Sequence, residues 1–403
     1  MARTRTLALI LAGGKGGRLE HLTRDRAKPA VSFAGTHRLI DFPLSNCRNS
    51  DVDDVWISVQ FNPISLSEHL ANGRPWDLDR TTGGLLLLHP RQGHDDRGGF
   101  VTGTADGLWR FAPLIREFAP DALLVLSADA AYRCNYDAIV DEHLEARTDL
   151  TMVTTEVDPD DAGRYGVVRS EGGRVREYRH KPDEPEGSLV ANEIFVFRPD
   201  RALDLLDSLA EEVGEEGLED LGDGLLPTLV EQGEVHEHRF EGFWRDVGTV
   251  DAYHAVHQEL LENPSPIDLD DPGWPIFTKE AARRAPAHVL ADATAQGSLL
   301  GPAATIGGHV ERSVIGRGVI VEPGAVVRDS VVLPGAIVRA GATVERAVLD
   351  ERTEVAAGGR VGEAGGDVAL VGLEATVGED DHVPGGGRFP DEDDADGSRS
   401  RAL

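Results

Sequence analysis

The sequence predicts a Rossmann-like α/β domain with a mostly parallel, mixed sheet, followed by a left-handed parallel β-helix of hexapeptide repeats. Short apolar runs alternate with segments of helical spacing, a glycine-rich loop follows the first run, and aliphatic residues later recur every six positions. We therefore expect an α/β domain over residues 1–262, a linker over 263–285, a β-helix over 286–377, and an acidic, disordered tail over 378–403.

The first strand runs into a glycine-rich loop. The apolar run Leu7–Leu11 suits a strand covered on both faces, as in a parallel sheet. Glycines bring backbone N–H groups close to a polyphosphate, and nearby cations neutralise its charge. Neither a P-loop nor G-x-G-x-x-G fits, because Lys15 precedes Gly16 and Leu19 stands three residues later. A turn without a ligand is the simpler alternative. The residues concerned are Gly13, Gly14, Gly16, Gly17, Arg18 and Lys28.

The elements that follow continue the alternation. In such sheets ligands bind beyond the carboxyl ends of the strands, where both the glycine loop and Asp129 fall. A hairpin with a Gly172-Gly173 turn is expected over 165–178. Strands are expected over 55–59, 85–88, 122–126, 150–154 and 192–197, and helices near 66–70, 103–118, 139–144, 203–213, 224–232 and 250–261.

The second half carries the repeat. A six-residue apolar period is typical of a parallel β-helix whose coils stack and bury a shared aliphatic column. A β-sandwich is the alternative, but it predicts alternation with a period of two. The positions are Val314, Ile320, Val326, Val332, Val338 and Val344, and then, after a one-residue slip, Leu349, Val355 and Val361.

Composition and charge exclude several classes of protein. A formal net charge of −31 argues against a general nucleic-acid binder, which needs a basic face. No apolar run is long enough for a membrane span, and no signal peptide is recognisable. Cys47 and Cys134 provide neither a disulfide framework nor metal-ligand spacing. We expect no nucleic-acid or membrane partner and a cytoplasmic location.

Four segments carry a family resemblance: 26–30 (RAKPA), 38–47 (RLIDFPLSNC), 103–106 (GTAD) and 244–249 (WRDVGT). Together they resemble the glucose-1-phosphate adenylyltransferase family over roughly Leu9 to Val361. The resemblance implies a nucleotidyltransferase catalytic domain over 1–262. The implied reaction converts ATP and α-D-glucose 1-phosphate to ADP-glucose and diphosphate for glycogen or α-glucan synthesis. Family members are typically tetramers controlled by metabolites, so a homo-tetramer or hetero-oligomer is expected.

The resemblance also implies roles for particular residues. Asp129 and Asp246 would hold Mg²⁺, because carboxylates suit a hard cation. Arg18 would contact the β- and γ-phosphates, Lys28 would lie near the bridging phosphates, and these two with Asp129 form the catalytic set. The nucleotide set is Ala12, Gly13, Gly14, Gln92, Gly103, Thr104 and Asp106. The sugar-phosphate set is Tyr165, Gly166, His180, Lys181, Asn192 and Glu193.

Each of these residues has a simpler possible role. Asp129 could cap a helix, and Asp246 could sit in a turn with Gly248. Lys181 could be a solvated charge before a proline, and Gln92 a solvated loop residue. Against these readings, Asp129, Lys181 and Asp246 fall in order at the family's positions.

The chain departs from the family in the sugar pocket and at the regulatory positions. His180 stands where the family has a Glu, Glu193 where it has a Gly, and Ala130 where it has a His. Thr36 and Thr102 replace basic residues. Such swaps can redirect sugar specificity or lower the rate.

These departures keep alternatives open. The chain could be a weakly active or regulatory paralogue, or an NDP-sugar pyrophosphorylase with another sugar. A hexapeptide acyltransferase would need a catalytic His within the coils, where His309 is the nearest candidate.

Overall fold

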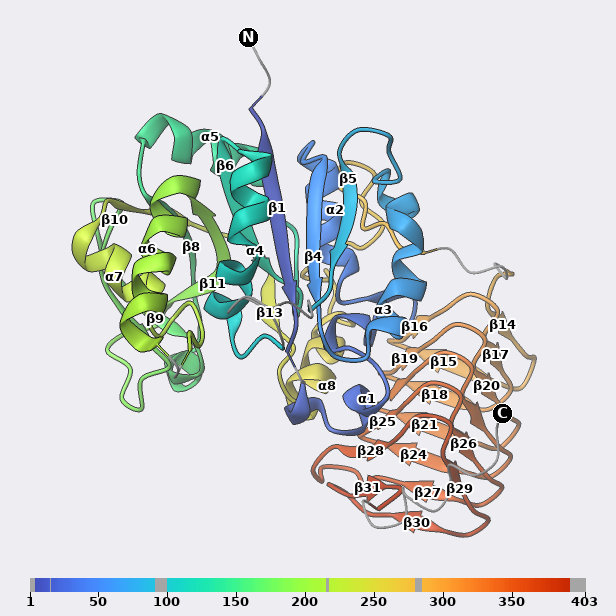
Figure 1. Cartoon of the computed structure of the whole chain (residues 1–403). Helices are drawn as coiled ribbons and strands as arrows, with labels where there is room; N and C mark the ends of the chain where they lie inside the picture. The colour runs from blue at the N-terminus through green and yellow to red at the C-terminus, as the bar shows by residue number, and fades with distance from the viewer. Residues whose placement is uncertain (1–3, 15, 91–99, 215–216, 280–284, 392–403) are drawn as a thin grey trace.

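The structure is a computed structural model that describes residues 4–14, 16–90, 100–214, 217–279 and 285–391. Figure 1 shows an α/β domain, coloured blue to yellow, beside an orange to red β-helix. The predicted fold class is confirmed. In the described part of the chain, no helix has both the length and the apolar character needed to cross a bilayer.

A mixed sheet forms the centre of the α/β domain. Its described part has nine strands in the order β5-β4-β1-β6-β11-β8-β12-β10-β9. Strands β5, β4, β1 and β6 are parallel, β11 runs antiparallel to β6 and β8, and β12 is parallel to β8. The bounds are β1 Thr6–Ala12, β4 Asp54–Val59, β5 Gly84–Leu88, β6 Ala122–Ser127, β8 Leu150–Glu156, β9 Gly166–Glu171, β10 Arg174–His180, β11 Leu189–Phe197 and β12 Val235–Arg239.

Helices cover both faces of this sheet, as its apolar strands require. Side chains of α4 (Thr104–Phe118), α6 (Pro199–Val213) and α7 (Leu225–Gln232) pack with Leu7, Leu9 and Leu123 in one buried cluster. Those of α2 (Asp41–Asn49), α3 (Pro63–Leu70) and α5 (Tyr136–Ala146) pack with Ala8, Ile10 and Leu124 in another. Successive residues of β1 and β6 thus point to opposite faces, which explains their unbroken apolar runs.

Short elements build the edge of the sheet where the site lies. Their bounds are α1 His21–Arg24, α8 Val250–Glu259, the 3₁₀ helices η1 Gly17–Leu19, η2 Lys28–Ala30, η3 Ala71–Trp76 and η4 Pro159–Arg164, the pair β2 Ser32–Phe33 and β3 His37–Arg38, and the pair β7 Ala130–Tyr132 and β13 Trp244–Asp246.

The β-helix consists of three parallel sheets that, within residues 285–391, have six strands each. In the first, β14 His288–Val289, β17 Thr305–Ile306, β20 Ile320–Val321, β23 Ile337–Val338, β26 Glu354–Val355 and β29 Thr376–Val377 stack. In the second, β15 Thr294–Gln296, β18 His309–Glu311, β21 Val326–Arg328, β24 Thr343–Glu345, β27 Arg360–Val361 and β30 His382–Val383 stack. In the third, β16 Leu299–Leu300, β19 Val314–Ile315, β22 Val331–Val332, β25 Ala347–Leu349, β28 Ala369–Val371 and β31 Arg388–Phe389 stack.

The register of the early coils differs from the prediction. Ile320 is 39% exposed, whereas its neighbour Val321 lies inside the column at 1%. Val327 likewise points inward beside the half-buried Val326. The doublets of aliphatic residues hide which member faces inward. The predicted one-residue slip between Val344 and Leu349 is present, but a further slip, which was not predicted, occurs between Val327 and Val332.

The predicted start of the tail is wrong. Strands β30 and β31 pair with β27 and β28, so the β-helix extends to Phe389 instead of ending at residue 377. The acidic composition of this stretch misled the prediction, because only Val383 and Phe389 contribute apolar side chains to the column there. Residues 392–403, the rest of the predicted tail, lie outside the described residues.

The two domains share a buried apolar cluster. Tyr253 and Val256 of α8 pack there with Phe33, Val331 and Leu370, which come from both domains. The predicted linker also packs, since Trp274 Nε1 donates to Asn46 Oδ1 at 2.9 Å. The β-helix is therefore docked firmly onto the loops that surround the end of β1.

Candidate active site

The glycine loop after β1 is built around a left-handed residue. Gly16 has φ +65°, and a Cβ there would lie 3.0 Å from Thr23 Cγ2 and 3.1 Å from Lys28 Cβ. Glycine is therefore required both by the backbone angle and by the close approach. Ala12 ends β1, Gly13 and Gly14 follow it, and Arg18 stands exposed on η1. Lys15 lies outside the described residues.

Lys28 lies between two carboxylates. Its Nζ donates to Asp129 Oδ2 at 2.6 Å and lies 3.9 Å from Asp246 Oδ1. Asp129 follows β6, and the pairing of β13 with β7 brings Asp246 opposite Ala130. Three predicted residues, widely separated in sequence, thus meet beyond the carboxyl end of β6.

Burial and charge shift the titration of this cluster. Burial raises the pKa of Asp246, and the neighbouring Asp129 raises it further. Burial also opposes ionisation of Asp129, but the Lys28 ammonium outweighs it and holds the pKa of Asp129 below its usual range. Burial disfavours the charged form of Lys28, yet the two carboxylates leave its pKa raised. The ammonium is therefore charged at neutral pH.

Two arginines border the cluster. Arg18 Nη2 and Asp246 Oδ2 both approach Gly248, at 3.5 and 2.7 Å from where a Cβ would stand. Arg164 Nη2 lies 3.7 Å from Asp246 Oδ2, and this nitrogen has no hydrogen-bond partner among the described residues. Each guanidinium can therefore still donate a hydrogen bond to an anionic oxygen.

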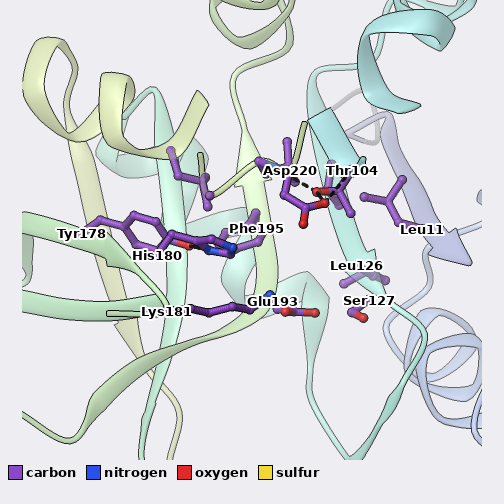
Figure 2. Close-up of a pocket in the computed structure, with 14 residues that line it drawn as sticks. Leu11, Thr104, Leu126, Ser127, Tyr178, His180, Lys181, Glu193, Phe195 and Asp220 are labelled. Atoms are coloured by element: carbon purple, nitrogen blue, oxygen red, sulfur yellow. Dashed lines mark hydrogen bonds between the residues drawn. The ribbon is translucent and has the colours of Figure 1, made fainter. Parts of the chain in front are cut away.

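Glu193 brings a third carboxyl group to the same place. It opens into the pocket shown in Figure 2, where its side chain points toward Ser127. Its φ of +61° is unusual for a residue with a Cβ, and it lies in an irregular stretch of the β11–β8 pairing. Surrounding protein atoms withdraw water from the Glu193 carboxyl group, and the negative charges of Asp129 and Asp246 repel its ionised form. Both effects raise the pKa of Glu193, to about 7.

The pocket of Figure 2 joins this cluster to a second wall. Lys181 and His180 extend from the end of β10 toward Glu193 and Phe195 of β11. The pocket is lined by Leu11, Thr104, Val125, Leu126, Ser127, Tyr178, His180, Lys181, Glu193, Phe195, Asp220, Leu221, Gly222 and Leu226. A lysine, an imidazole and carboxylates around one hollow suit a phosphorylated, hydroxyl-rich ligand.

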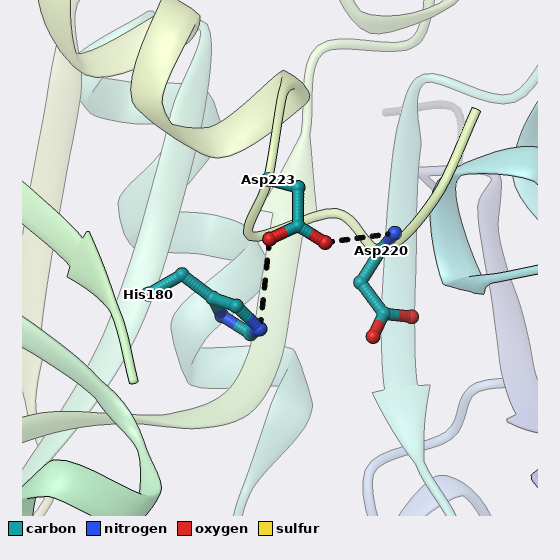
Figure 3. A group of neighbouring side chains, drawn as sticks. All are labelled: His180, Asp220 and Asp223. Atoms are coloured by element: carbon teal, nitrogen blue, oxygen red, sulfur yellow. Dashed lines mark hydrogen bonds and ion pairs between the residues drawn. The ribbon is translucent and has the colours of Figure 1, made fainter. Parts of the chain in front are cut away.

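His180 is held in place by its neighbours (Figure 3). Its Nδ1 lies 3.2 Å from Tyr178 Oη, and its Nε2 lies 3.9 Å from Asp223 Oδ1. A Cβ at Gly222 would lie only 2.1 Å from Nδ1, so the loop before α7 contacts the imidazole directly. Asp220, which approaches from the same loop, completes the group in Figure 3.

The 103–106 segment positions that loop. The backbone N and Oγ1 of Thr104 lie 3.0 and 3.1 Å from Asp220 Oδ1, and Oγ1 accepts from Leu221 N at 2.8 Å. Gly103 lies directly against the carbonyl of Glu219. The Asp106 carboxylate accepts from Thr102 N and Arg110 Nε, at 2.9 and 2.7 Å, and is not part of the pocket wall. This segment links the start of α4 to the wall that holds His180.

The remaining predicted residues lie around the pocket or outside the description. Tyr165 packs edge-on against Trp244, with ring centroids 5.4 Å apart, and Gly166 lies against the Tyr178 ring. The Asn192 amide is buried and without a hydrogen-bond partner in the described part of the chain. Gln92 falls outside the described residues.

Sequence reasoning missed several residues of the site. Ser127 Oγ donates to Asp129 Oδ1, and Gln60 makes two hydrogen bonds with the backbone of Val101. Arg164 and Asp220 were also not foreseen. Only Ser127 carried a signal, because it ends the strand that precedes Asp129.

The donor set fits a divalent cation. Two carboxylates, one from each side of the β7–β13 pair, converge beside Lys28, and their oxygens are the hard ligands that Mg²⁺ prefers. Lys28 is the present counter-charge, so the centre is acidic enough to accept a cation.

Comparison with protein families agrees with this geometry. A Nucleotidyl transferase family model matches residues 7–263, and the model "GlmU-like, C-terminal hexapeptide" matches residues 282–367. The chain is therefore a nucleotidyltransferase domain followed by a hexapeptide β-helix.

Curated relatives narrow this class. Glucose-1-phosphate adenylyltransferase of Acetivibrio thermocellus is 33% identical over 365 residues, which cover 90% of this chain and 84% of the relative. That of Fusobacterium nucleatum is 34% identical over 321 residues, or 79% and 83% of the two chains. That of Desulfitobacterium hafniense is 33% identical over 389 residues, or 96% of each. The chain belongs to the glucose-1-phosphate adenylyltransferase family.

Proposed function

We propose that this protein converts ATP and α-D-glucose 1-phosphate to ADP-glucose and diphosphate, a step of glycogen or α-glucan synthesis. The observation that carries the proposal is the Lys28 ammonium between Asp129 and Asp246, a cluster that Ser127 connects to the pocket lined by Lys181. Family membership supports the choice of ATP and glucose 1-phosphate.

In this reaction an oxygen of the sugar phosphate attacks the α-phosphorus of ATP. The new P–O bond forms as the bond to the bridging oxygen breaks, and diphosphate leaves with that oxygen. The protein's contribution is to hold the groups in line and to neutralise charge. Lys28, whose side chain is 10% exposed, is placed to do so near the bridging oxygens, and Lys181 to hold the sugar phosphate.

The other roles follow the same layout. Arg18 would meet the outer phosphates beside the glycine loop, and Ala12, Gly13, Gly14, Gly103 and Thr104 would border the nucleotide. Asp129 and Asp246 would hold Mg²⁺, which when bound neutralises phosphate charge. Tyr165, Gly166, His180, Asn192 and Glu193 would shape the sugar side, and Gln92 would read adenine.

The test is diphosphate release by the purified chain with Mg²⁺, ATP and a panel of sugar 1-phosphates. Release with glucose 1-phosphate is the expected result. Release with another sugar alone would overturn the sugar assignment and locate the change at His180 and Glu193. No release from folded protein that binds ATP would overturn the enzymatic proposal in favour of a regulatory paralogue.

Glu193 is the specific observation that favours the second possibility. Its carboxyl group lies between Lys181 and Ser127, the residue that donates to Asp129, and a sugar phosphate held by Lys181 would have to approach there. Two neighbouring negative charges repel, so this residue alone could weaken sugar-phosphate binding. By contrast, His309, the candidate for an acyltransferase, lies on an exposed face with Nδ1 2.9 Å from Thr294 Oγ1.

We further propose a cytoplasmic homo-tetramer or hetero-oligomer. Exposed apolar side chains on the β-helix, such as Val289, Leu299 and Ile320, support association. Light scattering of the purified chain measures the subunit number, and a monomer at micromolar concentration would contradict this expectation.

A further inference from the structure

A charged pair is buried between the two domains. The guanidinium of Arg26, in the α/β domain, donates from Nη1 to Asp350 Oδ1 at 2.8 Å and from Nη2 to Oδ2 at 3.2 Å. Asp350 belongs to the β-helix, just after β25. Its side chain is 0% exposed and that of Arg26 is 6% exposed. This is a bidentate contact, which fixes direction as well as distance.

The neighbouring Glu351 extends the contact. Its Oε1 accepts from Ser32 Oγ at 2.7 Å and lies 3.5 Å from both Arg26 Nη1 and Arg38 Nη2. Its backbone N donates to Asp350 Oδ1 at 2.6 Å, which orients that carboxylate. One corner of the β-helix thus holds the segment that runs from Arg26 to Arg38.

Lys28 lies within this held segment. It begins η2 two residues after Arg26, and Ala27 between them is fixed through its backbone N, 3.1 Å from Ser65 Oγ. With so short a connection, a shift of the Arg26 backbone reaches Lys28 Nζ, which must stay 2.6 Å from Asp129. The β-helix corner and the acidic cluster are therefore mechanically joined.

We propose that Asp350 is a positioning residue for the reaction: it acts through Arg26 to hold the Lys28 ammonium in its productive place. The inference rests on the proposed function. With this role for Asp350, the β-helix takes part in catalysis although none of the described β-helix residues lines the pocket of Figure 2.

The energetics of buried ion pairs favour a role in geometry. Removing two charges from water is costly, and an apolar pair of similar volume often keeps a protein equally stable. An apolar pair has no preferred direction of contact, whereas the two parallel hydrogen bonds from Arg26 to Asp350 allow only one orientation. Positioning is what an apolar replacement would lose.

The test is the double substitution Arg26→Met with Asp350→Leu in the full chain. We expect a thermal midpoint close to the wild type, KM values for both substrates within about threefold, and a kcat lower by about 10- to 100-fold, as for a small displacement of a catalytic group. A folded double variant with wild-type kcat would overturn the inference. If the double variant fails to fold, Arg26→Lys, which keeps the charge but not the fork, is judged in the same way.

A second readout does not depend on turnover. Acetylation of Lys28 by limiting acetic anhydride, followed by mass spectrometry, reports how closely the ammonium is held by Asp129. We expect Lys28 to be labelled faster in the double variant, because an ammonium released from its 2.6 Å contact with Asp129 is more accessible to the reagent. Unchanged labelling of Lys28 in the double variant would overturn the inference. A wild-type protein that releases no diphosphate would refute the proposed function but not the inference, because labelling can still be measured.

The matched control is Arg328→Met with Glu345→Leu. This pair, 3.1 Å apart, joins β21 to β24 within the β-helix, with the Arg328 side chain exposed and that of Glu345 half-buried. It should leave kcat and Lys28 labelling unchanged. An equal loss of kcat in the control would show that the effect is not specific to the interface, and would also overturn the proposal.

Discussion

Replacing Glu193 with glycine should stabilise the protein, because the native backbone there suits glycine better than glutamate. Its φ of +61° is a left-handed angle that costs a residue with a Cβ about 1–2 kcal/mol. Glycine loses more conformational entropy on folding than glutamate does, and this offsets about 0.5–1 kcal/mol of the relieved strain. The net gain in the free energy of unfolding is therefore about 0–1.5 kcal/mol. Relief of repulsion with Asp129 and Asp246 adds to it.

Urea denaturation in EDTA at pH 8 measures this gain. Glu193→Gln is the control, because it keeps the strained backbone and removes only the charge. We expect the order glycine, then glutamine, then wild type in stability, and a lower KM for the sugar 1-phosphate in both variants. A glycine variant no more stable than the wild type, with slower diphosphate release, would refute the reasoning and show that the carboxylate is used.

Three further changes test other parts of the structure. Asp129→Asn should lower diphosphate release at least about 100-fold, as loss of a preorganised charge does, with an unchanged circular dichroism spectrum; unaltered turnover would remove Asp129 from the site. Thr104→Val removes the hydroxyl contacts with Asp220 and Leu221 but keeps the backbone contact with Asp220. The KM values for the sugar 1-phosphate and for ATP, which Thr104 would border, should each rise up to about tenfold, the worth of about one hydrogen bond. The free energy of unfolding should fall between pH 6.5 and pH 4 by up to about 3 kcal/mol from His257 alone: burial lowers its pKa to about 4, so the unfolded chain takes up the proton first. His257→Phe should make the pH dependence of urea denaturation shallower, and an unaltered slope would exclude His257 as its source.

Much of the fold could be predicted because its signals are local. The run Leu7–Leu11 indicated a strand covered on both faces, and the six-residue period favoured a stacked coil over a β-sandwich. The register failed at Ile320 and Val321, where two adjacent aliphatic residues satisfy the same period. It also failed after Gly378, where charge masked Val383 and Phe389.

The site was harder to predict from residues alone. The family's motifs pointed to Lys28, Asp129 and Asp246, and in the structure a carboxylate oxygen of each aspartate lies within 4 Å of Lys28 Nζ. Arg164 and Asp220 were missed because their positions depend on how η4 and the loop before α7 fold back onto the sheet. No spacing in the sequence encodes such contacts.

The apolar cluster shared by α8 and the β-helix bears on how this protein can be divided. Tyr253, Val331 and Leu370 are all fully covered, and each owes its cover to the other domain as well as to its own. Cutting the chain between residues 262 and 286 would expose that surface on both fragments. The linker therefore separates two folds but not two independently unfolding units, and the two domains should unfold in one thermal transition. A chimaera with a foreign hexapeptide domain must also receive α8 residues that match that domain's surface.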